Sequence, residues 1–150
     1  MQEQMTYKEK EAWLNRAYEL RRERPALIEE WKELRRLRDI CTDTSVKLSG
    51  SGGRTTDNAT EAKYVRFADA SEAYYKQIMA ERERYLSVKA EIRRAINALP
   101  VAAERAVLTA RFLRFKKISE IARMTHYSIS HVKLLKRRGI EHICIKNNTL

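Results

Sequence analysis

The stretch ISEIARMTHYSISHVKLLKRRGIEHI, residues 118–143, decides how the C-terminal third of this chain folds. Val132 follows Ala122 by ten residues and Leu135 comes three later, which suits two short helices that cross closely over a small residue. Ser128 is a residue type that caps helix N-termini. The pattern therefore predicts a helix-turn-helix arrangement. The positions predicted to face inward are Ile121, Ala122, Thr125, Val132 and Leu135.

The turn of this motif is expected at residues 125–127. His126 occupies the position where such turns commonly have glycine, and histidine is one of the residues that tolerate a left-handed backbone. Tyr127 is expected in a buried slot just after the turn. Gly139 should weaken or end the second helix, at a cost of up to about 1 kcal/mol, so we predict that helix over 129–138.

Outward from this motif, Leu99 and Pro100 mark the end of a preceding helix, because the residue before a proline disfavours helical geometry. Pro100 suits the first turn of a new helix, which we expect over about 101–113. A short polar link, 114–117, should then lead into the motif.

The N-terminal part opens with a capping box, Thr6 followed by Glu9, which predicts a helix from Tyr7 to about Cys41. Its apolar residues recur in steps of three and four, as expected for one buried face. Pro25 interrupts the pattern and predicts either a kink near Arg24 or two abutting helices. The stripe runs through Trp13, Ala17, Leu20, Arg24, Leu27, Trp31, Leu34, Arg38 and Cys41.

A second long helix is predicted over 59–98, after a loop at 42–58 that holds three of the four glycines. Two amphipathic helices joined by one loop should fold back as an antiparallel, coiled-coil-like hairpin. Two helices cannot cover such broad stripes, so the remaining apolar surface should meet the C-terminal part or a second copy of the chain. The stripe residues expected in the core include Trp13, Trp31, Tyr75, Tyr85 and Cys41.

The charge of the 150-residue chain is unevenly spread. Its 31 Lys and Arg and 20 Asp and Glu give a net charge of +11, and residues 101–150 hold 11 basic and three acidic residues. A cationic C-terminal third indicates a polyanionic partner. The alternative is a basic face that serves only solubility.

Composition excludes several classes of protein. Four Gly and two Pro are too few for an all-β sandwich, and no glycine-rich phosphate-binding fingerprint is present. The two distant cysteines and three histidines lack metal-ligand spacing, and no catalytic constellation stands out. No apolar run is long enough to span a bilayer. We therefore expect no enzyme, cofactor, metal or membrane, and a cytoplasmic location.

The run LPVAAERAVLTARFLRFKKISEIARMTHYSISHVKLLKRRGIEHI, residues 99–143, resembles promoter-binding region 4 of the sigma-70 class. With a helical hairpin ahead of it, the chain is similar to phage late-transcription regulators of the RinA and ArpU type. The resemblance implies a DNA-binding regulator, usually an activator of a phage operon, in the bacterial host cytoplasm. The matching residues are Leu99, Pro100, Arg105, Arg111, Phe112, Glu120, Ile121, Ala122, Ser128, Val132 and Lys133.

We thus predict an all-α protein in two parts. Residues 1–99 form the hairpin, for self-association (a dimer is favoured) or contact with RNA polymerase. Residues 100–150 form the helix-turn-helix, which docks its helix 129–138 in the major groove of double-stranded DNA. The residues expected to read bases are Ile129 (by apolar contact with a thymine methyl group), Ser130, Lys133 and Arg137. Those expected at phosphates are Lys116, Lys117, Ser128, His131, Lys136 and Arg138.

Two other functions stay open. A DNA-packaging adaptor of the small-terminase type also couples a helix-turn-helix to an oligomerising hairpin, although usually in the reverse order. A coiled-coil protein adaptor could use the basic tail to bind an acidic protein, and its affinity would not depend on DNA sequence or fall as steeply with salt.

Overall fold

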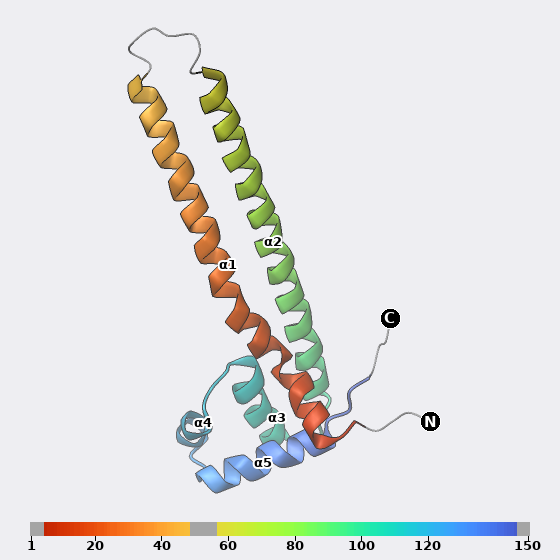
Figure 1. Cartoon of the computed structure of the whole chain (residues 1–150). Coiled ribbons are helices and arrows are strands. Elements are labelled where there is room, and N and C mark those ends of the chain that lie inside the picture. Colours follow the sequence, from red (N-terminus) through yellow and green to blue (C-terminus); the bar gives the residue numbers. More distant parts are fainter. Residues whose placement is uncertain (1–4, 49–56, 147–150) are drawn as a thin grey trace. The chain divides into compact units, whose positions relative to one another are not determined.

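The computed structural model describes residues 5–48 and 57–146, with side chains at 38, 40–48 and 57–60 left aside. Every regular element in these ranges is a helix, so the all-α prediction is confirmed (Figure 1). The helices are α1 (Tyr7–Leu48), α2 (Asp57–Asn97), α3 (Ala102–Leu108), the π-helical turn η1 (Thr109–Leu113), α4 (Ile118–Thr125) and α5 (Ile129–His142).

The chain divides into two compact units, and the division crosses both long helices. Unit 1 contains residues 1–21 and 84–150, and unit 2 contains residues 22–83. The boundary expected at residue 99 therefore does not coincide with a boundary between compact units. The helices after residue 100 share one unit with the first turns of α1 and the last turns of α2.

Helix α1 begins where the capping box predicts. The Thr6 N–H donates to Glu9 Oε2 at 2.7 Å, and the Glu9 N–H donates back to Thr6 Oγ1 at 3.4 Å. These bonds satisfy backbone donors that have no partner within the helix. The Glu9 carboxylate accepts hydrogen bonds from the Thr6 backbone N–H and from the Thr6 hydroxyl, and both lower the pKa of its carboxyl because they favour the charged form.

Helix α1 continues without a break through Pro25, so the expected alternative of two abutting helices was wrong. The other alternative, a kink near Arg24, stays a prediction. It also runs beyond Cys41, whose side chain lies outside the described set. Part of the loop expected at 42–58 is helical, since α1 ends at Leu48 and α2 begins at Asp57. The rest of that predicted loop, 49–56, lies outside the described residues.

Unit 1 contains a main apolar core built from both ends of the chain. One face of α1 packs against one face of α2, and side chains of α3, η1 and the end of α5 complete the cluster. Burial of this much apolar surface is the main force that holds these distant segments together. The buried members are Leu14, Ala17, Leu20, Val88, Ile92, Ile96, Leu99, Leu108, Phe112, Leu113, Ile140 and Ile143.

In unit 2, the segments of α1 and α2 run side by side in opposite directions (Figure 1). The ring centroids of Trp31 and Tyr75 lie 6.2 Å apart, and Ser71 and Ile78 are buried. Trp31 is half-buried, but Tyr75 is exposed, so its expected place in the core was wrong. Two helices alone leave the flanks of each apolar stripe open to solvent.

The segment between η1 and α4 contains a strained residue. Phe115 has a φ of 58°, a left-handed conformation that bulky residues rarely adopt. The Lys116 N–H donates to the carbonyl of Ala110 at 2.9 Å, which closes the wide turn after η1. Arg21 and Lys89 lie over the Phe115 ring at 4.9 and 5.7 Å from its centroid. These contacts hold the ring in place and offset the backbone strain.

Candidate nucleic-acid interface

Helices α4 and α5 form a second, smaller core with the helix before them. Ile121, Ala122, Val132 and Leu135 are buried, as expected from their spacing. They pack against Val107 and Ala110 of α3 and η1. Thr125 is half-buried, and its Oγ1 donates to the carbonyl of Ile121 at 2.7 Å. The predicted inward positions therefore do fix α5 against its neighbours.

The turn between α4 and α5 is tight because one residue takes a left-handed conformation. His126 has φ 57° and ψ 25°, at the position where glycine is common. Ser128 then caps α5, and its Oγ accepts from the His131 N–H at 3.2 Å. Both features were predicted from the sequence.

The start of α4 has a carboxylate as its cap. Glu120 Oε2 accepts the Lys117 N–H at 2.7 Å. This hydrogen bond is the largest cause of a lowered Glu120 pKa, and the charges of Lys116, Lys117 and Arg123 act in the same direction. The carboxylate also fits the positive end of the helix dipole.

Tyr127 is not in a buried slot, and that expectation was wrong. Its side chain is exposed, and its ring meets the His131 ring edge-on at 4.8 Å between centroids. Tyr127 thus covers the first turn of α5 from outside, while Val132 and Leu135 fill the space between the helices.

Helix α5 does not end near residue 138, and it continues through Gly139 to His142. A Cβ atom at residue 139 would lie 2.9 Å from Leu108 Cδ1 and 3.1 Å from Leu108 Cγ. Glycine is therefore needed for the close approach of α5 to α3. The following Ile140 and Ile143 are fully buried, and this packing outweighs the low helix propensity of glycine.

The C-terminal half of α5 is tied to the first turns of α1. Lys136 Nζ lies 2.6 Å from Glu11 Oε1, and Lys10 Nζ donates to the Glu141 carbonyl at 2.8 Å. Tyr7 lies in the same region, and its pKa is raised by burial first and then by the charges of Glu11 and Glu141. Lys136 therefore has a structural role, which differs from the phosphate contact expected from the sequence.

A second tether joins α5 to α3. The Glu104 side chain is almost fully buried, and its Oε2 lies 3.0 Å from Nδ1 of His142. A buried carboxyl needs such a partner because it has left water. This pair was not predicted, since the two residues are 38 positions apart and on different helices.

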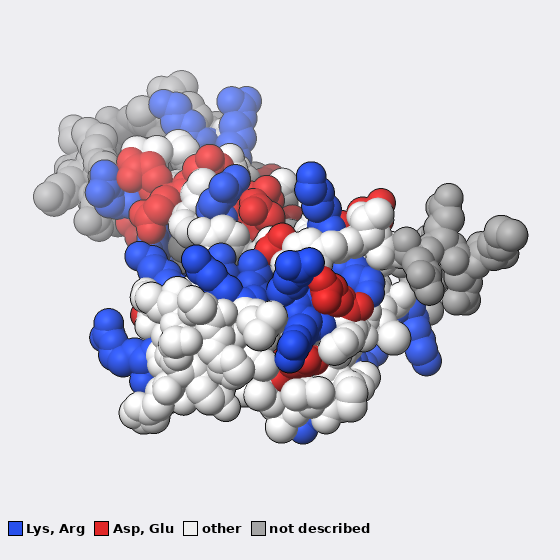
Figure 2. All heavy atoms as spheres, turned by 90° about the horizontal axis from the view of Figure 1, so that it is seen from below, with Lys and Arg blue, Asp and Glu red and all other residues white. Residues whose placement is uncertain are grey.

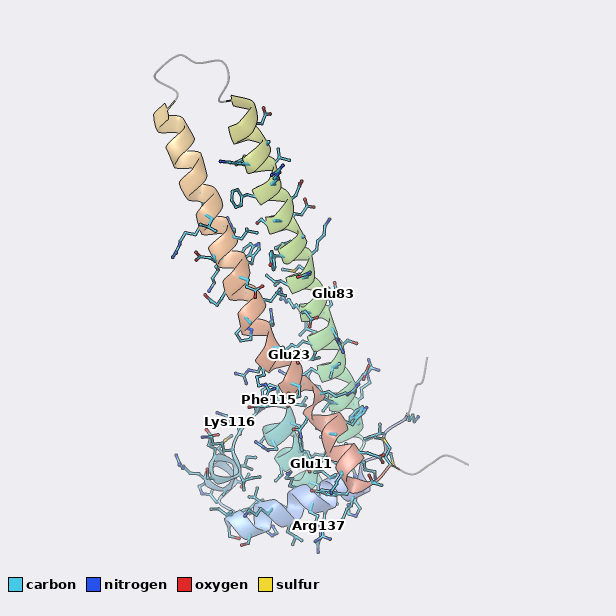
Figure 3. The ribbon with its side chains drawn as sticks, viewed as in Figure 1. Glu11, Glu23, Glu83, Phe115, Lys116 and Arg137 are labelled. Atoms are coloured by element: carbon cyan, nitrogen blue, oxygen red, sulfur yellow. The ribbon has the colours of Figure 1, made fainter. Side chains whose placement is uncertain are left out.

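The outer surface of α5 is exposed to solvent and carries three cations, Lys133, Arg137 and Arg138. Within the part of the chain that the structure describes, Lys133 and Arg138 form no ion pair. Arg137 lies on the outer side of α5 (Figure 3), where its Nε contacts Glu141 Oε1 at 3.0 Å while the side chain stays 73% exposed. Seen from below, Lys and Arg side chains gather in a band that also contains Asp and Glu, beside a broad uncharged area (Figure 2).

The structure leaves most of the predicted interface residues exposed. Ile129, Ser130, Lys133 and Arg137 are all exposed on α5, as are His131 and Arg138, and Ser128 is exposed at its N-cap. Lys117 is exposed at the start of α4. Lys116 is half-buried, with its Nζ 3.9 Å from Glu120 Oε1.

Two residues of this surface were not predicted. Leu134 is 41% exposed, and Glu141 lies beside Arg137. Leu134 follows Ser130 by four residues, which places both side chains on the same face of the helix. This spacing is the sequence signal from which the exposure of Leu134 could have been predicted.

Among the residues that the structure describes, no three or more His, Cys, Asp or Glu side chains cluster in a way that could hold a metal ion. In the same residues no helix combines the length and the hydropathy needed to cross a membrane. Cys144 has an exposed free thiol.

Comparisons with protein-family models, curated proteins and solved structures found no match for this chain.

Proposed function

We propose that the chain is a sequence-specific double-stranded DNA-binding transcription regulator. In this proposal α4, the turn at His126 and α5 act as a helix-turn-helix, and α5 docks in the major groove. One observation carries the proposal: the inner face of α5 is fixed in a core, while its outer face is exposed and has the cations Lys133 and Arg138 at its flanks. A rigid helix with these properties suits groove binding, since ordering it costs little on association.

The dimensions and charges of α5 agree with this role. The major groove of B-DNA admits one α-helix, and its base edges present a distinct pattern for each base pair. Ser130 and Arg137 on the outer face provide hydrogen-bonding groups for base edges. Lys133 and Arg138 are exposed without ion pairs in the described structure and can reach phosphates.

The link before α4 adds one exposed cation to the proposal. Lys117 is exposed, and we assign its ammonium group to a phosphate contact. Lys136 is left out of the proposed contacts because its ammonium group is paired with Glu11.

The long helices have a different role in the proposal. Residues 1–99 act as a helical hairpin that mediates self-association, with a dimer favoured, or contact with RNA polymerase. The support is the exposed apolar surface on α1 and α2, which includes Leu37, Tyr64, Val65 and Tyr75. Apolar side chains in such number are typical of a surface that meets a partner.

The test is a comparison of two double variants in a DNA-binding titration. Lys133→Ala with Arg137→Ala should weaken binding to a selected duplex by at least tenfold and make the affinity less salt-dependent. The matched control is Lys32→Ala with Arg36→Ala, which removes two exposed cations at the same spacing, each paired with a glutamate. Equal affinity of the two double variants would contradict the assignment.

The same titration separates the alternatives. A regulator should select one duplex from a random pool and bind it well above competitor DNA. Binding without sequence preference, together with ring-shaped oligomers in solution, would favour the packaging adaptor. Absence of DNA binding at low salt would favour the protein adaptor.

A further inference from the structure

The outermost residues of α5 form a single line along the helix. Ser130, Leu134, Arg137 and Glu141 follow each other at spacings of four, three and four, which keeps their side chains on one face. This face is opposite the one that carries the buried residues Val132, Leu135 and Gly139. In a groove-bound α5, the line would point at the base pairs.

Lys133 and Arg138, which form no ion pair with any residue that the structure describes, lie on opposite sides of this line. At about 100° per residue, Lys133 and Arg138 are each displaced from its centre by about 70°, in opposite directions. Such cations face the two walls of a groove, where the phosphates are. Lys133 is thereby better placed for a phosphate than for a base.

Ile129 is also displaced from the centre of the outer face. It shares its line with Lys133, Lys136 and Ile140, and this line becomes half-buried at Lys136 and fully buried at Ile140. Ile129 is exposed because it lies in the first turn of α5, but its side chain is directed toward one flank of the helix.

Leu134 is the apolar side chain at the centre of the outer face, between the polar group of Ser130 and the cation of Arg137. An isolated exposed leucine needs no explanation. A leucine at the centre of a polar face that has cations at its flanks has few ligands of matching chemistry, and the apolar group that the major groove presents is the C5 methyl group of thymine.

We infer that Leu134 reads a thymine methyl group in the major groove, and that the DNA site of this protein has a thymine opposite the middle of α5. The inference rests on the proposed function and makes it more specific. It assigns the methyl contact to Leu134, whereas the sequence suggested Ile129.

The experiment replaces thymines by deoxyuridine in a duplex selected by the full-length chain. Each replacement removes one methyl group and leaves base pairing intact. At one position, replacement of thymine by deoxyuridine should lower the affinity of the wild-type protein about fourfold. This is the change in affinity expected when one buried carbon group is removed from an apolar contact. Leu134→Ala should bind both duplexes equally, and Leu134→Met should restore part of the difference.

Two further variants serve as controls. Leu86→Ala removes a 52% exposed leucine from α2 and should keep the full methyl effect. Ile129→Ala should keep it as well. The inference is overturned if no thymine position shows the loss, if Leu134→Ala shows the same loss as wild type, or if Ile129→Ala abolishes it. Those results leave the proposed function standing, whereas a failure to select any duplex overturns both.

Discussion

Gly139 is the residue at which α5 and α3 approach most closely. A methyl group at this position would meet the fully buried side chain of Leu108, which would have to shift within the core. Overpacking of this kind costs about 1–3 kcal/mol, and the better helix propensity of alanine returns up to about 1 kcal/mol. We expect Gly139→Ala to lower the free energy of unfolding by about 1 kcal/mol, measured by urea denaturation.

The control for this substitution is Ser130→Ala, at an exposed position on the same helix, which should change stability by less than about 0.5 kcal/mol. A Gly139→Ala protein more stable than wild type would show that Leu108 can yield, and that helix propensity decides at this position.

Glu141 is an acidic residue on a surface proposed to bind DNA. It pairs with Arg137 at 3.0 Å, and exposed pairs of this kind contribute about 0–1 kcal/mol to stability. Glu141→Gln should therefore leave folding almost unchanged, free the guanidinium and raise DNA affinity severalfold at low salt, as measured by fluorescence anisotropy.

Glu72→Gln is the matched control, because Glu72 also pairs with a cation four residues later, Lys76. It removes the same charge far along the chain and should leave DNA affinity within about twofold of wild type. If both variants bind DNA equally well, Arg137 is not a contact residue.

At Phe115 an unfavourable backbone conformation is combined with favourable contacts of the side chain. The left-handed backbone costs a residue with a side chain about 1 kcal/mol or more, and the ring contributes its contacts with Arg21, Lys89 and the main core. Both Phe115→Ala and Phe115→Gly should destabilise the protein. The glycine variant should be the more stable of the two by about 1 kcal/mol, the reverse of their order in a helix, in chemical denaturation.

At the scale of elements, the cap of α4 links stability to pH. The folded-state pKa of Glu120 lies below its ordinary value, so its contribution is present above the ordinary carboxyl pKa and is lost as the pH falls through the folded value. Unfolding measured between pH 7 and pH 3 should therefore show stability falling with acid. Glu120→Gln keeps a hydrogen-bond acceptor without the charge and should make this fall smaller.

Glu9 at the start of α1 has a lowered pKa for the same reason, a hydrogen bond from the Thr6 backbone. The Glu120→Gln protein should therefore keep part of its acid sensitivity, and the Glu9→Gln, Glu120→Gln protein should lose more of it. An unchanged pH profile in the double variant would show that other carboxyl groups govern acid unfolding.

The sequence predicts elements well where the signal is local. The caps at Thr6 and Ser128 and the left-handed turn at His126 each depend on a few neighbouring residues, and all three are observed. The end of α5 and the partner of Lys136 depend on contacts with residues far away in sequence. Such contacts leave no periodic signal, so they could not be predicted.

In the candidate interface, too, local features could be predicted and contacts between residues distant in sequence could not. Residue spacing predicted which side chains of α5 face outward, and the structure leaves them exposed. It did not predict which cations would be used internally, because Glu11 is 125 positions away from Lys136. Phe115 was also missed, since no residue type in the link 114–117 signals a left-handed backbone.

At the scale of the whole molecule, the core of unit 1 needs both ends of the chain. A fragment of residues 100–150 would expose Leu108, Phe112 and Ile140, which pack against residues of α1 and α2 in the intact protein. We expect this fragment to lack a cooperative thermal unfolding transition. A chain of residues 1–21 joined by a short glycine-rich linker to 84–150 should unfold cooperatively, as followed by circular dichroism.

The division of α1 and α2 between two compact units has a consequence for evolution. Segments 22–48 and 57–83 can lengthen or shorten together by whole turns without touching the side chains that hold α5. Related chains should then differ freely in length there, and a lineage could change the length of this segment while it keeps the exposed surface of α5.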